Sequence, residues 1–189
     1  MTTIGGIHFF GAFLHWSALF YFKGERKVDI YRVAFIGHRV LTHQYGLEDK
    51  IERVVRDIIR EKEFVEFLMG RNGDYDIMAA STVKRVRESV GSDNSSLILI
   101  LPYRMKDDEY YEKYYDVIEY PIDINTHPKA AITARNRWMI ENADLLVAYV
   151  EKDRKGGAYT TMRYMEKLQK KTVNLAQKED TYYEKKKIG

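Results

Sequence analysis

Cysteine is absent from the 189 residues, so disulfide bridges and thiolate metal sites are excluded from this chain. The absence fits a reducing compartment, and we expect a cytoplasmic domain. The sequence also lacks a low-complexity tract and an internal repeat of the kind that builds a solenoid. It contains no histidine pair or carboxylate cluster at metal-binding spacing and no evident nucleophile–base pair. The residues therefore point to no metal and no cofactor.

What is present is the composition of a soluble globular protein, with 45% hydrophobic and 31% charged residues. The length fits one domain of ordinary size. The net charge of +3 is unevenly spread, because residues 1–27 and 167–189 are basic and the body between them is mildly acidic. An acidic body is a poor footprint for nucleic acid, which attracts basic surfaces. The charge pattern therefore argues against a nucleic-acid partner.

Residues 4–22 carry no charged side chain and precede a basic flank at residues 23–27. That length just spans a bilayer, and the flank would place the rest of the chain in the cytoplasm. Glycine, histidine and serine within the segment weaken its hydrophobicity. Two interpretations of residues 1–27 stay open: a membrane anchor, and a non-native leader. The domain itself is expected over 28–176, followed by a basic polar tail at 177–189.

From residue 29 onward, β-rich apolar runs alternate with segments of helical periodicity. The expected strands lie at 31–36, 64–69, 96–101, 117–120, 144–150 and 172–175. The expected helices lie at 47–59, 75–90, 103–116, 130–141 and 157–170. Successive β-α units predict an α/β fold: a Rossmann-like, doubly wound, mostly parallel sheet with helices on both faces. Ligands of such sheets bind at the carboxyl ends of the strands.

Four segments with glycine or arginine are expected at that edge. The most informative runs from Gly70 to Asp76, where a strand feeds a helix through a loop with two glycines. Such a loop brings backbone N–H groups and a helix N-terminus close to an anion. Asp76 has two open roles, helix capping and contact with a ribose hydroxyl, and His38 is either structural or in contact with a ligand. The predicted ligand-binding residues are Gly37, His38, Arg39, Gly70, Arg71, Asn72, Gly73, Asp76, Arg135, Gly156, Gly157 and Thr160.

Fifteen tyrosines are many for this length. Four of them, Tyr110, Tyr111, Tyr114 and Tyr115, fall together in the polar segment after the third strand. A packed or capping helix accounts for such a cluster.

Four motifs follow strands in order along the chain: Phe35-Ile36-Gly37-His38-Arg39, Gly70 to Asp76 with Ala79-Ala80, Arg135-Asn136-Arg137-Trp138-Met139 and Lys155-Gly156-Gly157-Ala158-Tyr159-Thr160. Together they resemble the superfamily that joins the DNA-processing protein DprA with the Lonely Guy proteins (SLOG), and within it the bacterial YpsA-like branch. The resemblance covers about residues 30–176 and implies a Rossmann-like domain that binds a nucleotide or an ADP-ribose-like molecule, with a homodimer as the default assembly.

The departures from the Lonely Guy enzymes bear on catalysis. These enzymes cleave nucleoside 5′-monophosphates, and Arg163 stands where they have a glutamate. Cleavage of an N-glycosidic bond needs a carboxylate to stabilise an oxocarbenium-like state, which an arginine does not supply. Glu166, one turn further along, is the remaining candidate acid. Asn136, Lys155 and Tyr159 also depart from the pattern.

Three functions follow from these observations. The favoured one is a nucleotide-binding domain with a sensor or regulatory role. The first alternative is a phosphoribohydrolase of the Lonely Guy type. The second alternative is DprA-like binding of single-stranded DNA, against which the acidic body argues.

Overall fold

A computed structural model of the chain describes residues 27–42, 45–71, 73–104 and 108–176. The predicted anchor or leader segment, Asn72 and the tail at 177–189 lie outside the described residues. Among the residues that are described, no helix combines the length and the apolar character needed to cross a membrane.

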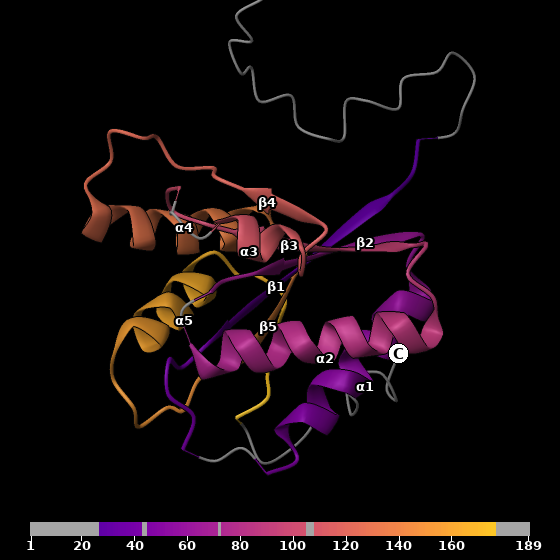
Figure 1. Cartoon of the computed structure of the whole chain (residues 1–189). Coiled ribbons are helices and arrows are strands. Elements are labelled where there is room, and N and C mark those ends of the chain that lie inside the picture. Colours follow the sequence, from indigo (N-terminus) through magenta and orange to yellow (C-terminus); the bar gives the residue numbers. More distant parts are fainter. Residues whose placement is uncertain (1–26, 43–44, 72, 105–107, 177–189) are drawn as a thin grey trace, which may run out of the picture.

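Strands and helices alternate along the chain (Figure 1). The strands are β1 (Ile30–Gly37), β2 (Phe64–Met69), β3 (Ser95–Ile100), β4 (Val117–Glu119), β5 (Leu145–Tyr149) and β6 (Thr172–Asn174). The helices are α1 (Leu47–Glu61), α2 (Asp74–Val90), α3 (Asp108–Glu112), α4 (Pro128–Asn142) and α5 (Gly157–Lys167).

The strands form one six-stranded sheet in the order β4-β3-β2-β1-β5-β6. Every neighbouring pair is parallel. The predicted α/β, Rossmann-like class is therefore confirmed, with a sheet that is wholly parallel. The strand order reverses direction between β1 and β5, and such a reversal is where parallel sheets of this kind bind ligands.

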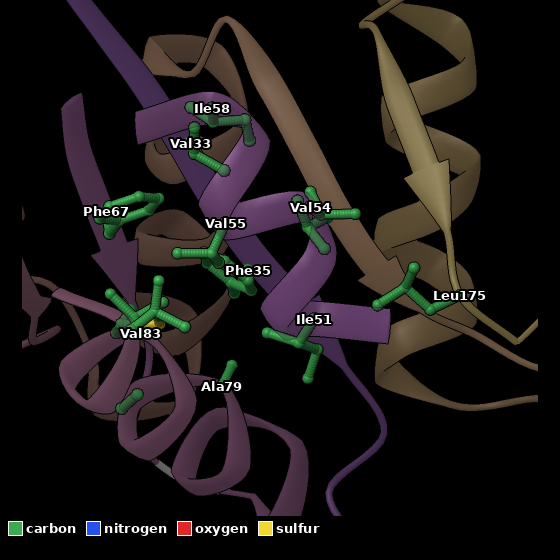
Figure 2. Close-up of a cluster of buried hydrophobic side chains, with 14 of the residues drawn as sticks. Val33, Phe35, Ile51, Val54, Val55, Ile58, Phe67, Ala79, Val83 and Leu175 are labelled. Carbon is green, nitrogen blue, oxygen red and sulfur yellow. The ribbon is translucent and has the colours of Figure 1, made fainter. Parts of the chain in front are cut away.

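The sheet is buried on both faces, as near-continuous apolar strands require. Alternate side chains of β1 serve the two faces: Val33 and Phe35 belong to one core cluster and Ala34 and Ile36 to the other. The first cluster is covered by α1 and α2, which Figure 1 places together on one side of the sheet. Its side chains interdigitate in Figure 2. The second cluster is covered by α4 and α5.

The predicted helix over 103–116 is shorter in the structure, where α3 covers Asp108–Glu112. The N–H groups of Tyr114 and Tyr115 both donate to the Tyr111 carbonyl, which closes the helix in a turn. The carboxylate of Asp116 then accepts the Leu97 N–H at 2.7 Å and begins the pairing of β4 with β3. Tertiary pairing of the edge strand thus shortens the helix.

Candidate functional site

A pocket of about 400 Å³ lies at the carboxyl ends of β1 and β5, where the strand order reverses. It is bounded by the loops after β1 and β5, the start of α2 and one face of α4. Residues far apart in the sequence therefore meet at the predicted edge of the sheet. The predicted residues that line it are Gly37, His38, Arg39, Gly73, Asp76, Arg135, Gly156 and Gly157.

Three other predicted residues lie outside this lining. Gly70 and Arg71 follow β2, where Gly70 lies against the Asp76 and Arg135 side chains and the Arg71 guanidinium lies over the Tyr111 ring. The Thr160 hydroxyl donates to the Gly156 carbonyl within its own helix, at 3.1 Å.

Arg135 is the most deeply buried cation of the pocket, with 5% of its surface exposed. Its Nη1 lies 3.8 Å from the sulfur of Met139, one helical turn along α4. Its Nε has no hydrogen-bond partner among the described residues. Burial lowers the pKa of the guanidinium, and the nearby Asp76 carboxylate raises it in part. An arginine stays charged in proteins, so the pocket holds a buried cation with an unused donor.

Gly70 lets Arg135 and Asp76 approach each other behind the end of β2. A Cβ at this position would lie 2.4 Å from Arg135 Nη1 and 2.7 Å from Asp76 Oδ2. The missing side chain therefore provides the space in which the guanidinium and the carboxylate are placed. Asp76 lies in the first turn of α2, so its negative charge also interacts favourably with the positive end of the helix dipole.

His38 joins the two loops at the reversal point. Its backbone N–H donates to the Tyr149 carbonyl at 3.2 Å, and its Nε2 accepts the Glu151 N–H at 2.9 Å. A nitrogen that accepts carries no proton, so the ring is neutral with its proton on Nδ1. Burial, and next Arg154, lower the pKa of His38, while Glu151 raises it. The residue thus acts structurally by holding the loop after β5.

Positive charge gathers around the pocket although the body of the chain is acidic. Arg39, Arg135, Arg154 and Lys155 face it, and Asp76 is the one carboxylate among its described lining residues. The net charge of the domain does not predict this arrangement, because the cations lie on separate segments that only the fold brings together. Such a pocket suits an anion with several oxygen acceptors, such as a phosphate.

Arg154 was missed among the predicted binding residues. Its Nη1 donates to the Val40 carbonyl at 2.7 Å, so it ties the loop after β5 to the loop after β1. Its position in the loop that follows the buried strand β5 was a usable signal, because that loop opens at the ligand edge. The other lining residues not predicted as contacts include Ile132, Asn136, Met139, Lys155 and Thr161.

Glu166 and Arg163, the residues on which hydrolase chemistry depends, lie on the exposed side of α5. They form an ion pair with each other at 3.2 Å, and their side chains are 54% and 67% exposed. Neither lines the pocket. Within the described ranges, no group of three His, Asp or Glu residues is arranged to hold a metal ion.

No protein-family model and no curated protein matches this sequence. Two solved structures are similar in fold. The first, DNA processing protein A (DprA) from Streptococcus pneumoniae, has a TM-score of 0.55 and 14% sequence identity, over 76% of this chain and 49% of that one. The second, DprA from Helicobacter pylori, is described as having a unique single-stranded DNA binding mode. It has a TM-score of 0.52 and 19% identity, over 75% of this chain and 63% of that one.

The prediction that nucleic acid is an unlikely partner is wrong. It rested on the acidic body, yet a neighbour of the same fold is described as binding single-stranded DNA. The physical reason is local, because cations gather around the pocket and the mean charge of the domain does not describe that surface. The chain spans about half the length of the pneumococcal protein and less than two thirds of the other. At these identities the likeness establishes that this domain has the Rossmann-like fold of DprA proteins.

Proposed function

We propose that this domain binds single-stranded nucleic acid and seats one phosphate of the strand against Arg135. The observation that carries the proposal is the buried guanidinium, whose Nε lacks a hydrogen-bond partner among the described residues while the side chain lines the pocket. A phosphate in the pocket would offer acceptor oxygens to this guanidinium, whose planar fork suits paired hydrogen bonds to phosphate. The fold shared with the Helicobacter protein supports a strand as the source of that phosphate.

The surrounding cations favour a polymer over a single small anion. Arg39, Arg154 and Lys155 line the same pocket, so phosphates on either side of the seated one would also meet positive charge. Binding of this kind releases counterions and weakens as salt rises. Strong salt dependence is therefore expected.

A free nucleotide or ADP-ribose-like molecule is the second candidate, and Asp76 is the observation that favours it. Its carboxylate stands beside Arg135, where it would accept hydrogen bonds from ribose hydroxyls. A sensor or regulatory role remains a prediction, and so does membership of the YpsA-like branch. For the hydrolase alternative, Asp76 would be the acid, because it lines the pocket whereas Glu166 pairs with Arg163 away from it.

The test is fluorescence anisotropy with a labelled oligo-dT at several salt concentrations, for the wild type and Arg135→Gln. Hydrogen bonds to charged groups contribute about 1.5–3 kcal/mol, so we expect affinity to fall by about 10- to 150-fold. The loss of one phosphate contact should also reduce the slope of log K against log salt by about 0.7. Arg85→Gln is the matched control, since this arginine pairs with Glu48 and Glu52 on the exposed face of α1 and α2.

Thermal unfolding of each variant shows whether the domain still folds. Parallel thermal-shift measurements with AMP, ADP-ribose and NAD, with an assay for released free base, separate the nucleotide and hydrolase alternatives. Absence of oligonucleotide binding at low salt, or unchanged binding by a folded Arg135→Gln variant, would refute the proposal. Stabilisation by AMP or ADP-ribose without oligonucleotide binding would instead support the second candidate.

A further inference from the structure

The four tyrosines of α3 and the turn after it form one aromatic cluster. The ring centroids of Tyr110 and Tyr111 are 5.4 Å apart in an edge-to-face contact, and those of Tyr114 and Tyr115 are 5.0 Å apart. Tyr111 and Tyr115 connect the two pairs at 6.4 Å. The cluster is thus continuous from the core to the surface.

Packing accounts for the inner pair. Tyr114 and Tyr115 pack against the core cluster beneath α2. Lys84 of α2 lies 4.1 Å from the centroid of the Tyr114 ring. The outer pair lies outside the core clusters: Tyr110 is 73% exposed, and Tyr111 is half-buried. The Tyr110 ring is therefore available to a ligand, with Tyr111 in edge-to-face contact beside it.

The outer pair is connected to the candidate pocket through the loop after β2. Gly70 lies against both Arg135 and Asp76, which line the pocket. Arg71 is the next residue, about 3.8 Å further along the backbone. Its guanidinium lies 4.5 Å from the centroid of the Tyr111 ring. The loop after β2 therefore touches the pocket wall through Gly70 and the outer tyrosines through the Arg71 side chain.

We propose that Tyr110 and Tyr111 form a base-stacking platform for the strand whose phosphate is seated at Arg135. The inference rests on the proposed function. Proteins that bind single strands combine a cationic groove for the backbone with aromatic rings on which bases stack. Both parts occur here at the carboxyl edge of the sheet, the pocket at the ends of β1 and β5 and the tyrosines after β3, and Arg71 of the intervening loop after β2 contributes positive charge beside Tyr111.

The arrangement identifies the ligand as an oligonucleotide with at least one base outside the pocket. Stacking uses the face that every base has, so binding should tolerate changes of sequence. A mononucleotide held only in the pocket would gain nothing from the platform. The tyrosines therefore separate a strand from a free nucleotide.

The experiment compares the wild type, Tyr110→Ala, the double variant Tyr110→Ala/Tyr111→Ala and the matched Tyr110→Phe/Tyr111→Phe. Affinity is measured for oligo-dT and for an abasic strand of equal length, which keeps the phosphates and removes the bases. Loss of one stacked base is expected to lower the affinity of the double alanine variant for oligo-dT by about 5- to 150-fold. The phenylalanine variant keeps its rings and should bind like the wild type.

A second readout follows the base directly. An oligonucleotide with 2-aminopurine should lose fluorescence on binding to the wild type and the phenylalanine variant, and keep more of it with the double alanine variant. Tyr110→Ala alone alters a largely exposed side chain, so it tests the platform even if the double variant unfolds.

The outcomes separate the two proposals. If the wild type binds no oligonucleotide, the proposed function and this inference both fail. If the wild type binds and Arg135→Gln is impaired, but the alanine variants bind oligo-dT unchanged, the platform is refuted and the proposed function stands. Equal losses on the abasic and the oligo-dT strands would also refute the platform, because the effect would not come from bases.

Discussion

Replacing Gly37 by alanine is expected to destabilise the domain, because the added methyl group would push β1 and α2 apart at the point where the strand order reverses. Gly37 is the last residue of β1 and pairs with Tyr149 of β5. A Cβ here would lie 2.4 Å from two ring carbons of Tyr75 and 2.8 Å from its Cβ. Tyr75 is fully buried, so its ring has no solvent into which it can move.

The loss of stability can be worked out from the displacement of the Tyr75 ring and from the hydrogen bond that this displacement weakens. Ordinary van der Waals contact begins at 3.4 Å, so the Tyr75 ring or the strand must shift by about 1 Å. The Tyr75 hydroxyl donates to the Val147 carbonyl at 3.0 Å, and such a shift would stretch that buried bond. Overpacking costs about 1–3 kcal/mol and a lost hydrogen bond about 0.5–1.5 kcal/mol. We expect the free energy of unfolding to fall by about 2–4 kcal/mol.

Urea denaturation measures this change as a lower midpoint at an unchanged slope. Gly157→Ala is the control, because a Cβ at that position meets no atom within 4 Å. If the clash with Tyr75 is the cause, the double variant Gly37→Ala/Tyr75→Ala should be no less stable than Tyr75→Ala alone. Additive losses in the double variant, or a loss below about 0.5 kcal/mol in Gly37→Ala, would refute the reasoning.

Two further predictions concern the pocket. Gly70→Ala should weaken oligonucleotide binding by about tenfold or more, measured by anisotropy, because the added Cβ displaces the guanidinium of Arg135 and the carboxylate of Asp76. The neutral His38, whose native pKa is lowered, should make the domain less stable as the pH falls below about 6.5, because the unfolded chain takes up the proton first. Urea midpoints between pH 5 and pH 8 measure that dependence, up to about 1.4 kcal/mol per pH unit from this group.

Each of these predictions has a matched comparison. Gly70→Ala should leave the urea midpoint less affected than Gly37→Ala, and unchanged binding would show that the pocket tolerates the displacement. His38→Gln keeps a side-chain acceptor for the Glu151 N–H and does not titrate, so its pH dependence should be shallower than that of the wild type. Parallel pH curves for the two proteins would exclude His38 as the source.

The local pattern of the sequence was enough to determine the fold. Buried strands such as 64–69 are almost wholly apolar, and the stripe from Leu47 to Ile59 in α1 repeats at helical spacing. Both signals depend on residues close together in the chain, and a succession of β-α units has few arrangements other than a parallel sheet. The short α3 was the exception, because the pairing of Asp116 with Leu97 overrode local helical preference.

The sequence by itself also indicated which edge of the sheet would carry a ligand, since the loops with glycine and arginine follow strands. Only the tertiary structure decided that positive charge gathers at that edge of the sheet. Arg39, Arg135, Arg154 and Lys155 come from three separate segments, and their convergence cannot be read from net charge. The burial of Arg135, its unused Nε and the position of Tyr111 beside Arg71 likewise depend on contacts between distant residues. Fold class is a property of local periodicity, whereas a binding surface is created when distant segments meet.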